Sequence, residues 1–377
     1  MTRDPLCPYF GQCGGCSTQH LPYAVQLANK RQSISRATGL SDIPVFSGPE
    51  YFYRNRLDLV FHPRGVGLRK KENWRVIVPI QKCVISNESL NALLREVSDF
   101  FTEPLDAFDV VKRTGTFHHV ILRTSGHSSE ATAIIFVLNK DSTRVAEAVK
   151  AIESFAEKTT AKNVLVMHVA ANSATDVSDD YFVVKGGGFL QGEYLGKKFV
   201  FAVQGFFQTN DGMAEKMQEY VHGLLKKYNT SGAHLLDLYG GVGTFGIINA
   251  PLFKSVTVVE SVPQCVEAAT RNALENGVTN LKAVALDAMR LKNLSFPKPL
   301  FVINDPPRSG MHPKTIEALK KLEPSVIIYI SCNVQQLGKD LPKFKRYKVK
   351  SAALFDLFPQ TNHLEAVTEL VLKGGIS

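Results

Sequence analysis

The segment His234-Leu235-Leu236-Asp237-Leu238-Tyr239-Gly240-Gly241-Val242-Gly243-Thr244-Phe245-Gly246 decides the fold class of this 377-residue chain. Its apolar first half predicts a buried strand, and its glycine-rich second half predicts a turn that opens a helix. From about residue 205 onward, further apolar strands alternate regularly with helical stretches. This alternation predicts an α/β domain built on a doubly wound, largely parallel sheet.

Two further parts precede this α/β domain. Residues 1–48 open with closely spaced cysteines and continue into a stretch with a helical pattern. Residues 49–203 mix strand and helix patterns without regular alternation, which predicts a central α+β domain. Residues 204–377 form the α/β domain. The chain is therefore predicted to contain an N-terminal segment and two domains, as its length suggests.

Charge and hydropathy limit the classes of partner. The chain carries 44 basic and 35 acidic residues, a net charge of +9, which favours a polyanion such as nucleic acid. No segment approaches the roughly 18 apolar residues of a membrane helix, and no apolar run follows Met1. We therefore expect a cytoplasmic protein without a membrane partner, and a monomer because no segment suggests a dedicated interface. Its six cysteines are expected to bind metal or act in catalysis.

Residues 51–75 read as a strand, a turn and a second strand, and they contain seven basic and two acidic residues. Aromatic residues are interleaved with these charges. Arginine and lysine bind phosphates and aromatic rings stack on bases, so the segment favours an RNA-binding surface over a merely solvated hairpin. The residues predicted to contact RNA are Arg54, Arg56, Arg69 and Lys70.

The glycine loop is followed by two acidic residues at the ends of predicted strands. Glycines such as Gly241 let the backbone approach a ligand closely. Glu260 is placed to bind the ribose hydroxyls of an adenosine, and Asp287 to meet the adenine amino group. A dinucleotide is the alternative ligand, but the G-x-G-x-x-G spacing that binds a pyrophosphate is absent. These residues favour S-adenosylmethionine.

Three later residues with catalytic chemistry also lie at strand ends. Asp305 belongs to a polar loop after one strand, Cys332 ends the next strand, and Glu365 begins the last one. Ligands of open α/β sheets bind outside the carboxyl ends of the strands, so we expect these side chains at one cleft. Cys332 is then a candidate nucleophile rather than a buried structural cysteine, and Glu365 a base rather than an exposed edge residue. The site should favour the thiolate, and a neighbouring helix N-terminus is one way to do so.

Together these residues resemble the RNA 5-methyluridine methyltransferase family. The motifs cover most of the chain and occur in the order Cys7-x5-Cys13-x2-Cys16, Cys83, Phe206-Phe207-Gln208-Thr209-Asn210, residues 237–246, Asp305-Pro306-Pro307-Arg308, Ser331-Cys332-Asn333 and His363-x-Glu365. The resemblance implies a Rossmann-like class I methyltransferase domain and an S-adenosylmethionine-dependent RNA (uracil-C5)-methyltransferase. One departure is Tyr239-Gly240, where the family often has Phe-Cys; an aromatic ring is retained.

The resemblance also implies residue roles and a target class. The positions matching those that hold S-adenosylmethionine or the nearby base are Gln208, Tyr239, Glu260 and Asp305, with Asp287 as a further candidate. Cys332 matches the nucleophile that adds to C6 of uracil, and Glu365 the base that removes the C5 proton. The cysteine motif begins at residue 7, so we expect the form of the family without an N-terminal TRAM barrel. That form resembles the ribosomal-RNA branch somewhat more than the transfer-RNA branch.

Cys7, Cys13, Cys16 and Cys83 make a set of four thiol ligands. Their chemistry suits either zinc or an iron–sulfur cluster. Spacing alone slightly favours zinc, although the five-residue gap between Cys7 and Cys13 is longer than the common zinc spacing. The resemblance implies a [4Fe–4S] cluster. Its expected role is structural, in shaping an RNA-binding surface, because the transfer of a methyl group needs no electrons.

Two other functions compete with this interpretation. A methyltransferase acting on an exocyclic amine also uses an Asp-Pro-Pro loop, but it needs neither Cys332 nor Glu365. A non-catalytic iron–sulfur or zinc protein that binds RNA needs no complete cofactor loop. The sequence favours uridine methylation over both.

Overall fold

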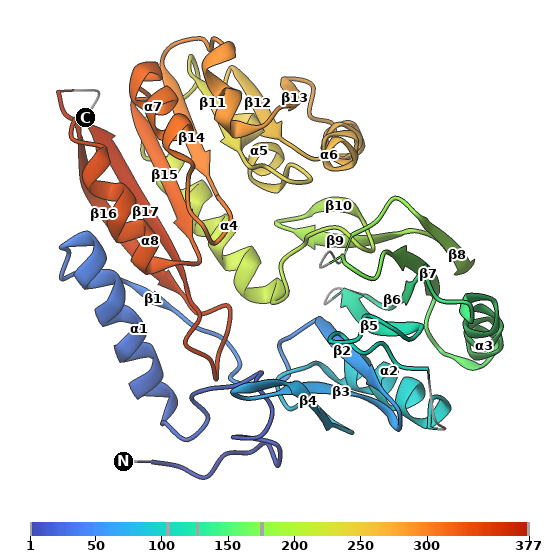
Figure 1. The fold of residues 1–377 in the computed structure, drawn as a ribbon. Coiled ribbons are helices and arrows are strands. Elements are labelled where there is room, and N and C mark those ends of the chain that lie inside the picture. Colours follow the sequence, from blue (N-terminus) through green and yellow to red (C-terminus); the bar gives the residue numbers. More distant parts are fainter. Residues whose placement is uncertain (1, 103–105, 126–127, 174–176, 375–377) are drawn as a thin grey trace.

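The computed structural model describes residues 2–102, 106–125, 128–173 and 177–374. Figure 1 shows two sheets, each with its own helices. The hairpin of β9 (Phe189–Tyr194) and β10 (Lys197–Ala202) lies between them. It contacts β6 (Ser128–Asn139) of one sheet and the helix α6 (Pro263–Glu275) that covers the other.

The larger sheet contains eight strands within the described residues, in the order β1-β16-β17-β15-β14-β11-β12-β13. Their bounds are β1 Val45–Phe46, β11 His234–Leu238, β12 Ser255–Glu260, β13 Leu281–Ala285, β14 Leu300–Asn304, β15 Val326–Ser331, β16 Tyr347–Phe355 and β17 Glu365–Leu372. Strands β11 to β15 are mutually parallel, as predicted, whereas β17 is antiparallel to both of its neighbours. From β11 the chain runs outward through β12 to β13 and then crosses back to β14, on the other side of β11. The strand order therefore reverses between β11 and β14, and ligands of such sheets bind in the crevice at this point.

Helices cover both faces of this sheet, which explains why β11, β14 and β15 are buried along their whole length. The helices of this part are α4 Asp211–Leu225, α5 Thr244–Asn249, α6, α7 Pro313–Leu322 and α8 Val334–Asp340, with 3-10 turns at Ala250–Leu252, Ala288–Asn293 and Leu341–Lys343. The predicted α/β methyltransferase fold is therefore present.

The smaller sheet has the order β4-β3-β2-β5-β6-β7-β8 in the part of the chain that the structure describes. The remaining bounds are β2 Arg56–His62, β3 Gly65–Lys70, β4 Asn73–Pro79, β5 Phe117–Ser125, β7 Asn163–Val169, β8 Tyr181–Lys185, α2 Glu88–Phe100 and α3 Val145–Lys158. Alternate side chains of β2 are buried, as its sequence predicts. Strand β4 is exposed over its first four residues, so this edge of the sheet faces solvent.

Part of the N-terminal segment belongs to the larger sheet. Helix α1 (Tyr23–Thr38) packs against α8 and β16, and β1 pairs in parallel with β16 (Figure 1). A buried ion pair fixes the helix: Lys30 Nζ lies 2.7 Å from Asp356 Oδ1. Removing either partner would leave a buried charge without a partner. No described helix has the length and apolar character needed to span a bilayer.

Candidate active site

The carboxyl edge of the larger sheet gathers most of the predicted site residues. Tyr239 follows β11, Glu260 ends β12, Asp305 follows β14 and Cys332 follows β15. The parallel register places Leu238 opposite both Val259 and Asn304, so these strands end at nearly the same level. Four residues far apart in sequence therefore meet along one edge.

The glycine loop has the tight backbone that its sequence predicts. Tyr239 and Gly241 have φ values of 62° and 54°, in the left-handed region. At Gly240 a Cβ atom would lie 2.5 Å from Val258 Cγ1, so only glycine fits against the neighbouring strand. The loop also positions Glu260, because Gly241 N–H donates to Glu260 Oε2 at 3.1 Å. The backbone N–H of Val262 donates to the other oxygen of this carboxylate at 2.9 Å.

Two acids near this loop, the buried Asp237 and the partly buried Asp305, have raised pKa values. Burial raises the pKa of Asp237 to about 7, although Gly246 N–H donates to it at 2.8 Å. Burial and then the charge of Asp237 raise the pKa of Asp305 to about 7 as well. Asp287 is more peripheral, and its side chain caps the turn that follows by accepting from Met289 N–H at 2.8 Å. The Asp305 side of the edge is thus a low-dielectric environment that favours neutral groups.

Gln208 lies where the two domains meet. Its backbone carbonyl accepts a hydrogen bond of 3.1 Å from Asn55 of the central domain. The next residues begin α4, and Asn210 Nδ2 donates to the Leu357 carbonyl at 3.0 Å, near the loop that leads into Glu365. Gln208 is therefore held between the smaller sheet and the catalytic edge.

Cys332 and Glu365 are neighbours across β15 and β17. Ser331 pairs with Ala366, so the next antiparallel positions outward are Cys332 and Glu365. Side chains at directly opposed antiparallel positions point to the same face of a sheet. The half-buried Cys332 lines a recess of about 640 Å³ together with Arg308 and His363. Glu365 is only 5% exposed, and its Oε2 has no hydrogen-bond partner among the described residues.

The electrostatics of this pair differ from the sequence-based expectation of a stabilised thiolate. Burial, followed by the charges of Glu365 and Asp305, raises the pKa of the Cys332 thiol to about 11. Burial and then Asp305 raise the pKa of Glu365 well above its usual range, and Arg308 opposes this. The half-buried thiol lies near two acids, and both effects favour its protonated form.

Sequence reasoning missed several residues of the site. Asn304 is fully buried, and neither polar atom of its amide has a partner among the described residues. Ser33 and Arg36 of α1 also line the recess of Cys332. The position of Asn304 at a strand end next to Asp305 was an available signal. No sequence signal places α1, which lies about 300 residues away along the chain.

The loop before Glu365 is tied to the N-terminal segment through Gln360. This buried residue has a left-handed backbone, with φ of 69°. Its carbonyl accepts from Ser17 and Thr18 N–H at 3.0 and 3.1 Å, and its side-chain oxygen accepts from Arg3 at 3.1 Å. The cysteine-bearing segment is thereby attached to the loop that carries His363 and leads to the Cys332–Glu365 pair.

Three cysteines of the N-terminal segment and one of the central domain surround a separate cavity. Cys7, Cys13, Cys16 and Cys83 line this cavity, and its volume is about 70 Å³. Burial raises the pKa of Cys7, Cys13 and Cys16, and the charge of a Cys83 thiolate contributes to each shift. Within the described residues, no three His, Cys, Asp or Glu side chains form a group that could hold a single metal ion. The four thiols nonetheless line one cavity.

Three of the four predicted RNA-binding residues line one recess of the smaller sheet. These are Arg54, Arg69 and Lys70. The fourth, Arg56, does not line it and forms an ion pair of 2.9 Å with Asp58. The structure therefore separates two classes of basic residue that the sequence treats alike.

Comparison with known proteins identifies the family. A family model described as tRNA (Uracil-5-)-methyltransferase matches residues 22–373, nearly the whole chain. The chain belongs to this family. Membership confirms the predicted enzyme class and counts against both the amine-methylating and the non-catalytic alternatives.

Three relatives match this chain over most of their own length. A tRNA (uracil(54)-C(5))-methyltransferase of Pyrococcus horikoshii is 32% identical over 369 residues, covering 97% of this chain and 85% of the relative. An uncharacterised RNA methyltransferase of Caldanaerobacter subterraneus is 32% identical over 377 residues, covering 96% and 83%. The crystal structure of the Pyrococcus abyssi tRNA (uracil-54, C5)-methyltransferase with S-adenosyl-L-homocysteine has a TM-score of 0.77 at 27% identity, covering 95% and 86%.

Proposed function

We propose that this enzyme transfers a methyl group from S-adenosylmethionine to C5 of uridine 54 in tRNA. The observation that carries the chemistry is the opposed pair Cys332–Glu365 at the carboxyl edge of the sheet, beside the glycine loop. The choice of target rests on relatives that are named for uridine 54 of tRNA. They favour tRNA over the ribosomal RNA that the sequence alone slightly favoured.

In the proposed mechanism, Cys332 Sγ adds to C6 of the target uracil. The addition makes C5 nucleophilic, and C5 takes the methyl group of the donor. Glu365 then removes the proton from C5, and the bond between Sγ and C6 breaks to release 5-methyluridine and the thiolate. A uracil must leave its stack to reach a recess of this kind. Asp305 and the amide of Asn304, which has no partner among the described residues, are proposed to meet the edge of the base.

S-adenosylmethionine fits the residues of this edge. The fixed Glu260 carboxylate suits ribose hydroxyls, and Tyr239, Gly241, Asp287 and Gln208 are the further residues proposed to hold the cofactor. When bound, the cofactor supplies an activated methyl group and a positive sulfonium. A positive charge near buried acids lowers their pKa. A bound sulfonium would therefore favour the anionic forms of Cys332 and Glu365, which burial opposes.

We also propose that Cys7, Cys13, Cys16 and Cys83 bind a [4Fe–4S] cluster. The donor set fits, because four thiols line one cavity and a cluster takes one thiolate at each of its four irons. Zinc would instead require all four thiolates to converge on a single ion. The proposed role of the cluster is to hold the segment that contacts Gln360 and β3. Iron and acid-labile sulfide in equal amounts after anaerobic purification would support it; stoichiometric zinc would contradict it.

The reaction is tested with tritiated methyl donor and RNA from a strain that lacks this gene. Wild-type enzyme is incubated separately with tRNA and ribosomal RNA fractions, and labelled nucleosides are identified by mass spectrometry. We expect 5-methyluridine in the tRNA fraction, mapped to position 54. Label in ribosomal RNA would reassign the target, and label in any other nucleoside would overturn the reaction.

A further inference from the structure

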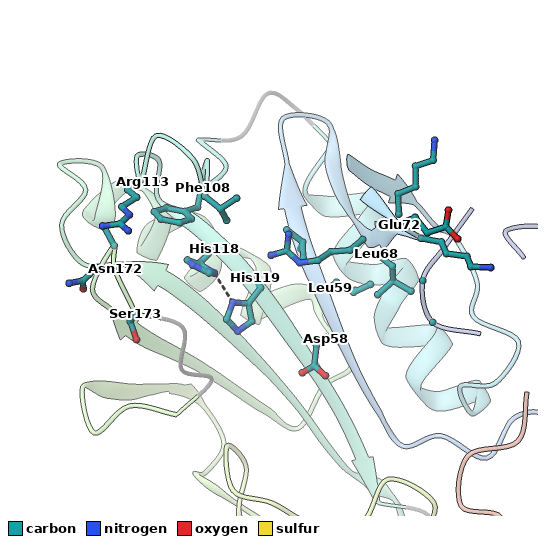
Figure 2. Close-up of a pocket in the computed structure, with 18 of the residues that line it drawn as sticks. Asp58, Leu59, Leu68, Glu72, Phe108, Arg113, His118, His119, Asn172 and Ser173 are labelled. Atoms are coloured by element: carbon teal, nitrogen blue, oxygen red, sulfur yellow. Dashed lines mark hydrogen bonds between the residues drawn. The ribbon is translucent and has the colours of Figure 1, made fainter. Parts of the chain in front are cut away.

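A second large recess lies in the smaller sheet, apart from the active site. Its volume is about 790 Å³, and it shares no lining residue with the recess of Cys332. Figure 2 shows Phe108, His118 and Arg113 on one wall, with Leu68 and Glu72 on the wall facing them. The walls come from β2, β3, β5, the loop before β5 and the backbone at Gly14 and Gly15.

The recess is strongly basic. The cationic side chains that line it are Arg54, Arg69, Lys70, Lys71 and Arg113, and the carboxylates are Asp58 and Glu72. Asp58 is already paired with Arg56, at 2.9 Å, so its carboxylate neutralises less of the positive charge of the recess than a count of charged residues implies. Lys70, Lys71 and Arg113 are exposed. Exposed cations around a recess are suited to phosphate groups, because they hold charge in water and release counterions on binding.

The wall opposite the basic hairpin carries flat rings with hydrogen-bonding edges. Phe108 and His118 are stacked, with ring centroids 4.4 Å apart and an interplanar angle of 22°. The Nδ1 atoms of His118 and His119 lie 2.9 Å apart (Figure 2). Burial lowers the pKa of both histidines, that of His119 to about 4, so both rings are neutral at neutral pH.

The contact between the two histidines fixes what the rings offer to a ligand. One Nδ1 must carry the proton and the other must accept it. Each neutral imidazole has one proton, so one Nε2 is then an acceptor and the other a donor. A donor–acceptor pair beside a stacked ring matches the edge and face of a nucleobase.

The basic wall is held in place by the cysteine segment. Gly14 N–H donates to the Arg69 carbonyl at 3.0 Å, and Lys71 N–H donates to the Gln12 carbonyl at 2.7 Å. These bonds flank an isolated antiparallel bridge between Cys13 and Lys70, at the C-terminal end of β3. The recess is therefore bordered by fixed backbone on the side where its cationic side chains gather.

We infer that this recess binds one unstacked nucleotide of the substrate RNA, away from the target uridine, with its base against Phe108, His118 and His119 and its phosphates at the cationic rim. The inference rests on the proposed function, since it concerns the same RNA substrate. It extends that function by giving the enzyme a second point of recognition. A folded RNA that fills both recesses is positioned more strictly than a strand held at the target base alone.

The binding test uses an unmodified tRNA transcript and the Cys332→Ala background, in which no methylation occurs. Phe108→Ala is expected to raise the Kd about tenfold, as for the loss of a base–aromatic stack, and Phe108→Tyr to restore binding. Arg113→Gln is expected to raise the Kd and to reduce the salt-dependence slope by about one. Lys150→Gln, on the exposed surface of α3, is the charge-matched control and should leave the Kd unchanged. Equal Kd values for Phe108→Ala, Arg113→Gln and the control would overturn the inference.

Cross-linking locates the nucleotide directly. A transcript containing 4-thiouridine is irradiated with the Cys332→Ala protein, and cross-linked peptides are sequenced. We expect peptides covering residues 106–119 or 66–72 joined to a nucleotide other than the target uridine. Cross-links confined to peptides around Cys332 would contradict a second nucleotide site. Methylation of the same transcript by the wild type is measured in parallel, so failure of the proposed reaction is distinguished from failure of this inference.

Discussion

The catalytic edge of the larger sheet and the basic recess of the smaller one show opposite uses of the same physical effect. At the edge, burial raises the pKa of Asp237, Asp305 and Glu365 and so favours their uncharged, protonated forms. In the recess, burial keeps two histidines neutral, whereas the cations around them remain exposed. Desolvation disfavours charge in both places. The catalytic groups therefore lie where ionisation is unfavourable and depends on their surroundings. The cations proposed to bind RNA lie in water, where they stay charged.

This contrast predicts a hierarchy of mutational effects. Substitutions at the catalytic edge should change turnover strongly, and the size of the change should depend on pH. Substitutions of the exposed cations around the recess should change RNA affinity modestly, and the size of that change should depend on salt. The following predictions run from the largest expected effect to the smallest.

Replacing Cys332 with alanine should lower methyl transfer by roughly 10⁴-fold or more, because no other described thiol lines its recess. Incorporation of tritiated methyl into tRNA measures the effect. A titration with S-adenosylhomocysteine shows whether the variant is folded. Methylation of uridine at more than a few per cent of the wild-type rate would rule out the covalent mechanism.

Glu365→Gln should lower turnover by roughly 10²- to 10⁴-fold while methylation on the enzyme proceeds. The variant retains the nucleophile but cannot remove the C5 proton, so a covalent adduct between Cys332 and methylated RNA should accumulate. A denaturing gel with labelled RNA detects it. The double variant Cys332→Ala with Glu365→Gln is the control, and absence of an adduct in the single variant would assign the base elsewhere.

The single-turnover rate should rise with pH through neutrality, by up to about tenfold per pH unit. Both Cys332 and Glu365 act without their protons, and burial raises both pKa values, so acid conditions leave them protonated. Because Asp305 raises both of these pKa values, Asp305→Asn should move the rise to lower pH even though it lowers the maximum rate. A flat profile would show that neither group loses a proton in the rate-limiting step.

Glu260→Ala should weaken S-adenosylmethionine binding about 10- to 100-fold, the range expected for a hydrogen-bonding charged group. Isothermal titration measures the Kd. Asp287→Ala is the variant for comparison. The Asp287 carboxylate caps a turn at the periphery, so its loss should weaken cofactor binding less than the loss of the Glu260 carboxylate. If Asp287→Ala weakened binding more than Glu260→Ala, the two proposed roles would have to be exchanged.

Lys70→Gln should raise the Kd for tRNA only a few-fold and reduce the salt slope by about one. Arg56→Gln is the matched variant at a position where the charge is already paired with Asp58, and it should change the slope less. Filter binding at several salt concentrations distinguishes them. Equal changes in slope would mean that Arg56 also reaches phosphate.

Much of the catalytic domain could be predicted because its strands and loops are locally encoded. The apolar run ending at Leu238, the glycines after it and the acid at Glu260 follow one another along the chain, and the structure has them as β11, the loop and the end of β12. Parallel strands share one carboxyl edge, so Asp305 and Cys332 could also be assigned to it. The helical pattern over residues 23–38 also predicted α1, but it could not predict that α1 packs against α8 and β16.

What the sequence determined by itself is the set of reactive groups, the alternation that makes a parallel sheet and the four thiols near the N-terminus. The tertiary structure decided which of these groups are desolvated and which share a recess. It placed α1 beside Cys332, separated Arg56 from Arg69, and buried the Cys332 thiol next to two acids, against the thiolate expected from sequence. The reason is that burial and Coulomb interactions depend on distances between residues far apart along the chain, whereas local patterns specify only neighbours.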